Sequence, residues 1–168
     1  GNKMYLDKLY AYYQYSESIM FDPETKLFYR DTKYIYPKHK SANGKKDFWA
    51  RGDGWLFAGL AKVLQDLPKD YEHRAYFEIQ FKNMAKTLAK AQQKEGYWTR
   101  SILDPAHAPG PETSGTAFFT YGYLWGMNNG YFKKCNKAHP LSVIMSLNFN
   151  PSSLAFALSS LISVSKKP

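Results

Sequence analysis

Two similar units start at positions 27 and 97, and this repeat restricts the fold more than any other feature of the sequence. Each unit opens on a short aromatic segment that ends in arginine, at Leu27-Phe28-Tyr29-Arg30 and at Tyr97-Trp98-Thr99-Arg100. Each segment follows an amphipathic helical pattern and precedes a long polar loop, after which comes a helical pattern that is apolar on most sides. A repeated unit of this kind buries its apolar faces only against its neighbours. We therefore predict an all-α fold of helical hairpins stacked side by side, as in an α/α toroid or part of one.

Apolar residues at spacings of three and four predict four helices, at residues 3–20, 53–67, 70–94 and 117–128. The first and third patterns leave one polar side, so we expect these helices on the outside. The second and fourth are apolar nearly all round, which is typical of helices that lie inside a fold. The two long loops should then lie together at one end of the hairpins, where functional residues usually are.

The length of 168 residues suits one domain with a core of its own. We expect residues 1–130 to form the helical unit, because residues 131–168 differ from them in composition. This Ser- and Lys-rich tail has no acidic residue and one apolar segment, 154–164, which predicts a single helix. The first residue is Gly rather than Met, which predicts that the natural N-terminus lies upstream. The compartment, periplasm or cytoplasm, therefore stays open.

The net charge of +9 points to a polyanionic partner until the charges are mapped along the chain. Five of the 23 basic residues are lysines of the tail, and the other 18 stand against 14 acidic residues. No nucleic-acid-binding motif accompanies this mild excess, so nucleic acid is not an expected partner. No apolar run is long enough to span a membrane, so we expect no membrane partner.

Histidine and cysteine give no sign of a metal site or a nucleophile. The four histidines are scattered without the spacing of metal ligands, so we expect no metal. The single Cys135 cannot form an internal disulfide, and it has no neighbouring His that would activate it.

Two tryptophans flank an arginine at the start of the second helical pattern, in the run Phe48-Trp49-Ala50-Arg51-Gly52-Asp53-Gly54-Trp55. An indole offers a flat apolar face with one N–H donor, and a guanidinium is a rigid fork of donors shaped for carboxylates. Trp49, Arg51 and Trp55 therefore suit a sugar ring that carries an acid group. Asp53 would lie at the helix N-terminus, where the helix dipole favours a carboxylate. An ordinary core pair of tryptophans with a surface ion pair is the alternative, which the spacing leaves open.

Several distinctive motifs follow one another over about residues 3–130. They are Trp49-Ala50-Arg51-Gly52-Asp53-Gly54-Trp55, Gly96-Tyr97-Trp98-Thr99-Arg100-Ser101, Leu103-Asp104-Pro105, Glu112-Thr113-Ser114-Gly115-Thr116-Ala117 and Trp125-Gly126-Met127-Asn128-Asn129-Gly130. With these motifs the chain closely resembles the unsaturated rhamnogalacturonyl and unsaturated glucuronyl hydrolases of glycoside hydrolase families 88 and 105. The resemblance implies helical hairpins of an (α/α)6 toroid, with only part of the barrel present.

The resemblance also implies a reaction and a partner. Members of these families remove the 4,5-unsaturated uronic acid from the non-reducing end of acidic, pectin-derived oligosaccharides. A catalytic Asp protonates the enol-ether double bond and activates a water, with no metal or organic cofactor. That Asp belongs to a segment of the type Asp-Ala-Leu-Phe-Met-Ala, on the inner helix before the one that corresponds to residues 3–20 here. We therefore identify no catalytic residue in this chain and expect little or no hydrolysis by it alone.

Carried over position by position, the resemblance assigns substrate binding to Trp49, Arg51, Trp55, Arg30, Thr113 and Ser114. Arg51 corresponds to the fork that binds the uronate carboxylate. Arg30 falls where other members have a substrate-facing His or Arg, and Thr113 and Ser114 fall at the rim of the same pocket. Asp53 occupies a position that is often Asn, so we interpret it as a helix-start residue rather than the acid.

Two other functions remain open on the sequence alone. The chain would be a non-catalytic oligosaccharide-binding module if it had lost its acid. It would be a homo-oligomer if a second copy completed the helical ring, because the exposed apolar surface of inner helices favours association.

Overall fold

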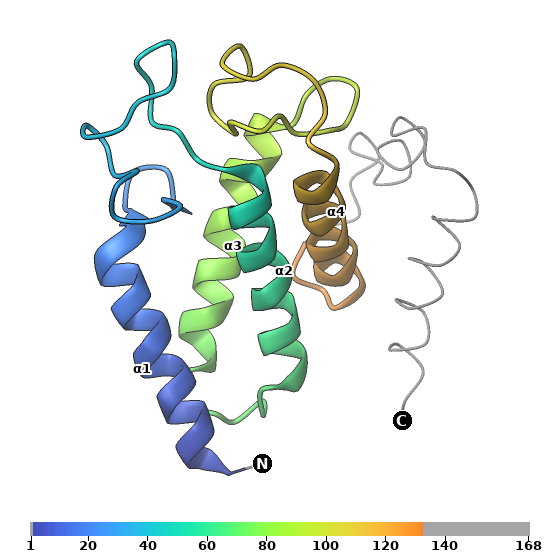
Figure 1. The fold of residues 1–168 in the computed structure, drawn as a ribbon. Coiled ribbons are helices and arrows are strands. Elements are labelled where there is room, and N and C mark those ends of the chain that lie inside the picture. The colour runs from blue at the N-terminus through green and yellow to red at the C-terminus, as the bar shows by residue number, and fades with distance from the viewer. Residues whose placement is uncertain (1, 133–168) are drawn as a thin grey trace.

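The computed structural model describes residues 2–132, which form four helices and one two-stranded sheet (Figure 1). The helices are α1 (Lys3–Met20), α2 (Ala50–Asp66), α3 (Arg74–Ala91) and α4 (Thr113–Asn128). The strands are β1 (Phe21–Asp22) and β2 (Leu27–Phe28). The predicted tail at 131–168 lies almost wholly outside the described residues, and its predicted helix at 154–164 lies entirely outside them.

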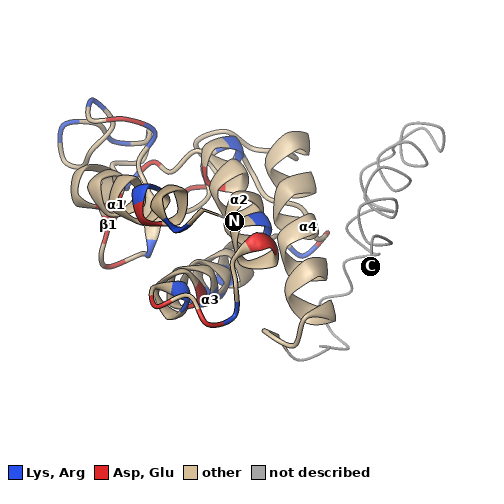
Figure 2. Cartoon of the chain, turned by 90° about the horizontal axis from the view of Figure 1, so that it is seen from below, with Lys and Arg blue, Asp and Glu red and all other residues tan. Residues whose placement is uncertain are grey.

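The helices alternate between an inner and an outer layer, as the repeat predicts. α2 makes its most extensive contacts with α4 and packs on its other side against α3. α1 packs against α3 and the turn before it, because Tyr10 stacks on His73 with ring centroids 3.8 Å apart and Tyr13 meets Phe77 edge-on at 5.5 Å. α2 therefore lies between α4 and the outer pair α1 and α3, an order that Figure 2 shows from below.

A two-residue antiparallel ladder joins α1 to the first loop. Phe21 pairs with Phe28 and Asp22 with Leu27. The turn between the strands is held by Asp22, whose Oδ2 accepts bonds from the N–H and the hydroxyl of Thr25 at 3.0 and 2.6 Å. The short extended segment predicted around Leu27 is thus the second strand of a hairpin.

Three helices start or end at positions other than those predicted, because loop contacts decide where the helices begin. α2 begins at Ala50 rather than at 53, directly after an extended Trp49. α3 covers only the middle of the predicted span 70–94, because residues 68–73 form turns in which the Tyr71 N–H donates to the Pro68 carbonyl. α4 begins at Thr113 rather than at 117, since the Glu112 side chain caps it.

The core lies where α2, α3 and α4 meet. Phe57 of α2 stacks on Phe81 of α3 with ring centroids 4.7 Å apart, and Trp98 of the second loop meets Phe119 of α4 at 5.1 Å. Each of these four rings is at most 1% exposed. The Trp98 indole N–H is paired as well, since it donates to the Leu88 carbonyl at 2.8 Å.

α2 and α4 are less enclosed than their sequences predict. Phe57, Leu60 and Leu64 are buried on α2, but Trp55 on the same helix is 65% exposed. On α4 the buried positions are mostly small or polar, and Trp125 is only half-buried. α4 carries no Lys, Arg, Asp or Glu, whereas the two signs are interspersed on the loops and on α1 and α3 (Figure 2). Among the described residues, no helix combines the length and the apolar character that a membrane span needs.

Candidate functional site

The two long loops lie side by side at one end of the helices, as predicted (Figure 1). An antiparallel bridge pairs Trp49 with Ser101. On either side of it the Ala50 N–H donates to the Arg100 carbonyl at 2.9 Å, and the Ile102 N–H donates to the Phe48 carbonyl at 3.0 Å. This bridge fixes the start of α2 against the second loop, so residues from both loops share one site.

A second set of contacts holds the outer parts of the same loops together. Asp104 is buried and accepts hydrogen bonds from the Ser41 hydroxyl and the Asn43 amide. The Ala42 N–H donates to His107 Nδ1 at 3.0 Å. The hydrogen bond from Ser41 is the main cause that holds the pKa of Asp104 below its ordinary value, so the carboxylate stays ionised.

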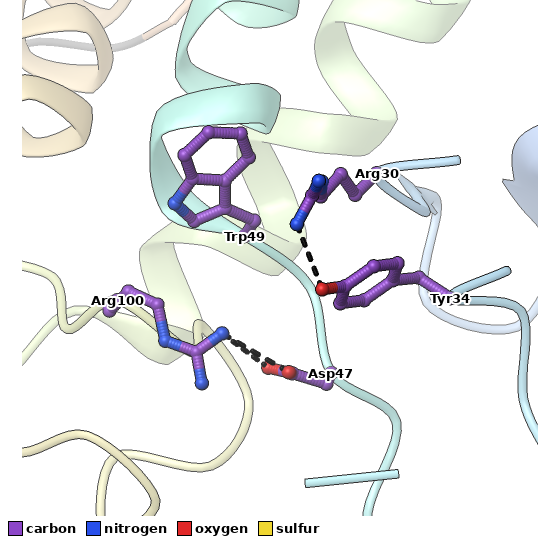
Figure 3. Close-up of a pocket in the computed structure, with 5 residues that line it drawn as sticks. All are labelled: Arg30, Tyr34, Asp47, Trp49 and Arg100. Atoms are coloured by element: carbon purple, nitrogen blue, oxygen red, sulfur yellow. Dashed lines mark hydrogen bonds and ion pairs between the residues drawn. The ribbon is translucent and has the colours of Figure 1, made fainter. Parts of the chain in front are cut away.

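A pocket of about 240 Å³ opens between the loops (Figure 3). Its lining consists of Arg30, Tyr34, Asp47, Trp49 and Arg100. Sites for drug-sized ligands span roughly 300–1,000 Å³. This smaller volume suits one sugar ring and a substituent of its neighbour rather than a whole oligosaccharide.

Arg30 and Trp49, two of the predicted binding residues, form one side of this pocket. The Arg30 guanidinium carbon lies 5.7 Å from the centre of the Trp49 ring and 4.6 Å from that of Tyr34. Arg30 Nη1 also donates to the Tyr34 hydroxyl at 2.8 Å (Figure 3). These contacts hold a cation beside an aromatic face that is only half-buried.

Arg51 and Trp55 lie near this group but outside the pocket lining. The Arg51 guanidinium carbon is 4.8 Å from the Trp49 ring centre, and the side chain is exposed. Trp55 leans on Phe118 of α4 with ring centroids 4.4 Å apart. Because Trp55 is 65% exposed and Trp49 half-buried, the alternative of a core tryptophan pair does not hold.

Thr113 and Ser114 begin α4 and are not among the pocket-lining residues. Thr113 is exposed, and the Ser114 hydroxyl donates to Glu112 Oε1 at 2.5 Å. The other oxygen of Glu112 accepts the Gly115 N–H. In this structure the Ser114 hydroxyl therefore belongs to the helix cap, and Thr113 is the exposed first residue of α4.

Asp47 and Arg100 are pocket residues that the sequence analysis did not assign. Asp47 accepts bonds from Arg100 Nη1 at 3.1 and 3.3 Å and lies 3.1 Å from His39 Nε2. Burial opposes ionisation, but the side chains of Ser101, His39 and Arg100 outweigh it, so the pKa of Asp47 lies below its ordinary value. Asp47 is thus a carboxylate held in its ionised form.

The alternation of an extended segment was a signal for Asp47. Successive side chains of extended backbone point to opposite sides. Phe48 is fully buried, so its neighbours Asp47 and Trp49 both face the pocket. The repeat that aligns Arg100 with Arg30 was a signal for Arg100, although its place in the pocket depends on the bridge between the two loops.

Asp53 is inside the fold rather than at the mouth of the site. Its Oδ1 accepts the Phe28 N–H at 3.0 Å, and its Oδ2 has no hydrogen-bond partner among the described residues. Burial raises the pKa of Asp53 to about 8. The prediction that Asp53 belongs to the first turn of the second helix is confirmed, and its carboxyl ties that turn to β2.

Within residues 2–132 no three His, Cys, Asp or Glu side chains come together as metal ligands. The pocket lining offers a ligand two guanidinium groups, one carboxylate, one tyrosine hydroxyl and the aromatic face of Trp49. Arg30 and Arg100 are arginines on different walls, and Asp47 is turned toward one of them (Figure 3).

Comparison with known proteins places this chain in a defined group. The profile of the family described as Glycosyl Hydrolase Family 88 matches residues 1–144. An unsaturated 3S-rhamnoglycuronyl hydrolase of Formosa agariphila is 39% identical over 140 residues, which are 81% of this chain. The chain spans only 37% of the length of that relative.

Solved structures agree with this result. A glycosyl hydrolase family 88 protein from Bacteroides vulgatus is 54% identical with a TM-score of 0.80, over 88% of this chain and 42% of its own. A structure described as a polysaccharide lyase is 60% identical with a TM-score of 0.78, over 86% of this chain and 40% of its own. The four helices are therefore hairpins of part of an (α/α)6 toroid, as the sequence resemblance predicts.

Proposed function

Because this chain belongs to glycosyl hydrolase family 88, we propose that it carries the substrate-binding part of a hydrolase for unsaturated uronyl oligosaccharides. The observation that carries the proposal is Trp49, whose ring has guanidinium carbons of Arg51 and Arg30 at 4.8 and 5.7 Å. An aromatic face accepts the apolar side of a planar sugar ring. Guanidinium groups beside that face bind the carboxylate that such a ring carries.

The proposed binding residues divide into an inner and an outer group. Trp49 and Arg30 line the pocket, and the unsaturated ring would bind there. Arg51 and Trp55 lie exposed beside the pocket. There the Arg51 guanidinium and the Trp55 indole would contact the bound ligand. Thr113 and Ser114 stay as proposed rim residues, at the start of the neighbouring helix α4.

The reaction we propose is hydration of the enol ether, with the acid supplied from outside these 168 residues. Asp47 is the one carboxyl in the pocket lining, and it is held ionised, so it has no proton to donate. Asp53 holds a proton, but its carboxyl is buried against β2. The curated relative from Formosa agariphila is much longer than this chain, which leaves room for an acid elsewhere.

The substrate class follows from the named relatives and from the charge of the site. The Formosa agariphila relative is named for unsaturated rhamnoglycuronyl substrates. We propose an acidic oligosaccharide that ends in an unsaturated uronic acid, of the kind that lyases release from rhamnogalacturonan and other pectins. The cations of the pocket support an acidic ligand over a neutral one.

Titration calorimetry with an unsaturated galacturonyl disaccharide tests the proposal. We expect the native chain to bind it and Arg51→Ala to weaken binding by about tenfold or more, because a charge-assisted fork to the carboxylate is lost. Lys86→Ala, on the exposed side of α3, is the matched control and should bind like the native chain. Equal affinities of the native and Arg51→Ala chains would contradict the assignment of Arg51.

The double bond also gives a direct measure of turnover, since its ultraviolet absorbance is lost on hydration. We expect the 168-residue chain to bind the disaccharide without consuming it. Rapid loss of absorbance would show that the acid lies within this chain and would refute that part of the proposal.

A homo-oligomer is a second candidate, favoured by exposed rings on α1 and α2. Tyr5, Tyr12, Tyr15 and Trp55 are each about two-thirds exposed, from 65% to 69%. Apolar surface of this kind often marks a protein–protein contact. Light scattering at micromolar concentration distinguishes the candidates, because a monomer that binds the disaccharide supports the binding function alone.

A further inference from the structure

Arg100 and Asp47 line the pocket, and the proposed function gives neither of them a role. Arg100 comes from the second loop, whereas the proposed uronate-binding residues near the pocket come from the first loop and the start of α2. In Figure 3 the side chains of Arg100 and Arg30 lie on opposite sides of the pocket. The pocket therefore has a second positive wall.

The backbone of Arg100 is held firmly in this wall. Its carbonyl accepts the Ala50 N–H at 2.9 Å, and the next residue, Ser101, forms the bridge with Trp49. The distance between the Trp49 ring and the Arg100 backbone is thus set by a direct connection between the loops. A ligand on Trp49 meets Arg100 without a rearrangement of the loop.

The Arg100 side chain is anchored at one nitrogen and open at the others. Nη1 donates to both oxygens of Asp47, at 3.3 and 3.1 Å. Nη2 and Nε have no hydrogen-bond partner among residues 2–132, and the side chain is 34% exposed. Asp47 itself is 2% exposed and is satisfied further by His39 at 3.1 Å. Asp47 therefore orients the guanidinium and leaves Nη2 and Nε available to a ligand.

The charges of the pocket favour an anion at this point. Arg30 and Arg100 contribute two positive charges to the lining and Asp47 contributes one negative charge. An arginine that served only to pair with Asp47 would need no open face on a cavity. Arginine donors bind paired oxygens, such as those of a carboxylate or of a tetrahedral oxyanion.

We propose that Arg100, oriented by Asp47, is a specificity-determining residue that binds an anionic group on the sugar next to the unsaturated uronate. The group is a carboxylate or a sulfate ester, which share the paired oxygens that a guanidinium binds. This inference rests on the proposed function, because it places the uronate on Trp49 and the neighbouring sugar toward the second loop.

Calorimetry with three unsaturated disaccharides tests the inference on the full chain. The first has an unmodified rhamnose next to the unsaturated uronate, the second has a sulfated rhamnose, and the third has a galacturonate. We expect the native chain to bind one or both of the disaccharides with a second anionic group about tenfold or more tightly than the disaccharide with the unmodified rhamnose. The preferred disaccharide identifies the group as a sulfate ester or as a carboxylate.

Arg100→Gln should remove this preference and leave the affinity for the disaccharide with the unmodified rhamnose within a factor of about two. Arg100→Lys, which keeps the charge but loses the fork, should restore part of the preference. Arg51→Ala should weaken all three ligands, and Lys86→Ala none. Circular dichroism establishes that each variant is folded before its affinities are compared.

The outcomes separate this inference from the proposed function. Equal binding of all three disaccharides by the native chain would overturn the role of Arg100 and leave the uronate site standing. An equal loss for all three ligands in Arg100→Gln would likewise overturn it, since Arg100 would then only support the pocket. If the native chain binds none of the disaccharides, both proposals fail.

Discussion

Asp47 and Asp53 are carboxyl groups at the two ends of one short segment, and their surroundings give them opposite charge states. Asp47 faces Arg100 and His39, which together with the Ser101 side chain keep its pKa below the ordinary value despite burial. Asp53 has one N–H donor and no cation, so burial raises its pKa to about 8. The same side chain is therefore a fixed anion in the pocket and a neutral acid in the core.

Asp53→Asn should stabilise the protein at neutral and alkaline pH. An unfolded Asp ionises at about pH 4. Between about pH 4 and pH 8 the folded protein keeps a proton that the unfolded chain releases, so the free energy of unfolding falls as pH rises. Asn cannot ionise and still accepts the Phe28 N–H. We expect the melting temperature of Asp53→Asn to exceed that of the native chain at pH 8, by a margin that shrinks toward pH 5.

Thermal melts followed by circular dichroism at several pH values measure this difference. Asp66→Asn, at the exposed end of α2, is the control and should follow the native chain at every pH. A constant difference between Asp53→Asn and the native chain from pH 5 to pH 8 would contradict the assigned pKa.

At the scale of elements, the close approach of α2 and α4 depends on a missing side chain. A Cβ at Gly115 would lie 2.8 Å from the carbonyl carbon and oxygen of Ala50, which are backbone atoms that cannot turn aside. These atoms also adjoin the bridge between the loops, since the Ala50 N–H donates to Arg100. The packing of two helices and the position of the pocket therefore share one contact.

Gly115→Ala should push α4 away from α2 and reduce the free energy of unfolding by about 1–3 kcal/mol. Gly59→Ala, inside α2, is the matched control because a Cβ there meets nothing within 4 Å. That substitution should leave stability unchanged or raise it by up to about 1 kcal/mol, since Ala favours a helix more than Gly does. Urea denaturation of both variants measures the two effects, and similar values would refute the steric argument.

At the scale of the whole molecule, four aspartates make the free energy of unfolding fall at both low and high pH. The pKa values of Asp22, Asp47 and Asp104 lie below the ordinary value, so their contribution is complete above about pH 4 and is lost as the pH falls further. Asp53 acts in the opposite direction, and its contribution declines from about pH 4 to pH 8.

We therefore expect the melting temperature of the native chain to be highest between about pH 4 and pH 6 and to fall on both sides. Substitution of Asp53 by Asn should flatten the alkaline side and leave the acid side as it is. A single series of thermal melts from pH 3 to pH 9 tests this, and a maximum above pH 8 would contradict it.

The sequence by itself determined the helices, their inner and outer order and the meeting of the two loops. These features follow from local patterns, because apolar spacing and the repeat of one unit are readable without knowledge of distant contacts. The motif around Trp49 was also recognisable in the sequence, and the structure places Trp49 beside Arg30 in the pocket between the two loops. Family membership was evident from the order of several motifs and is confirmed by the comparisons.

Tertiary structure alone decided which side chains share the pocket. Asp47 and Arg100 are brought together by a bridge between two loops, and that contact depends on how α2 and α4 pack. Asp53 is buried by β2, so its protonation also depends on a distant segment. Pairings of this kind are set by the packing of separate elements and have no periodic signal in the chain, which is why they could be found only in three dimensions.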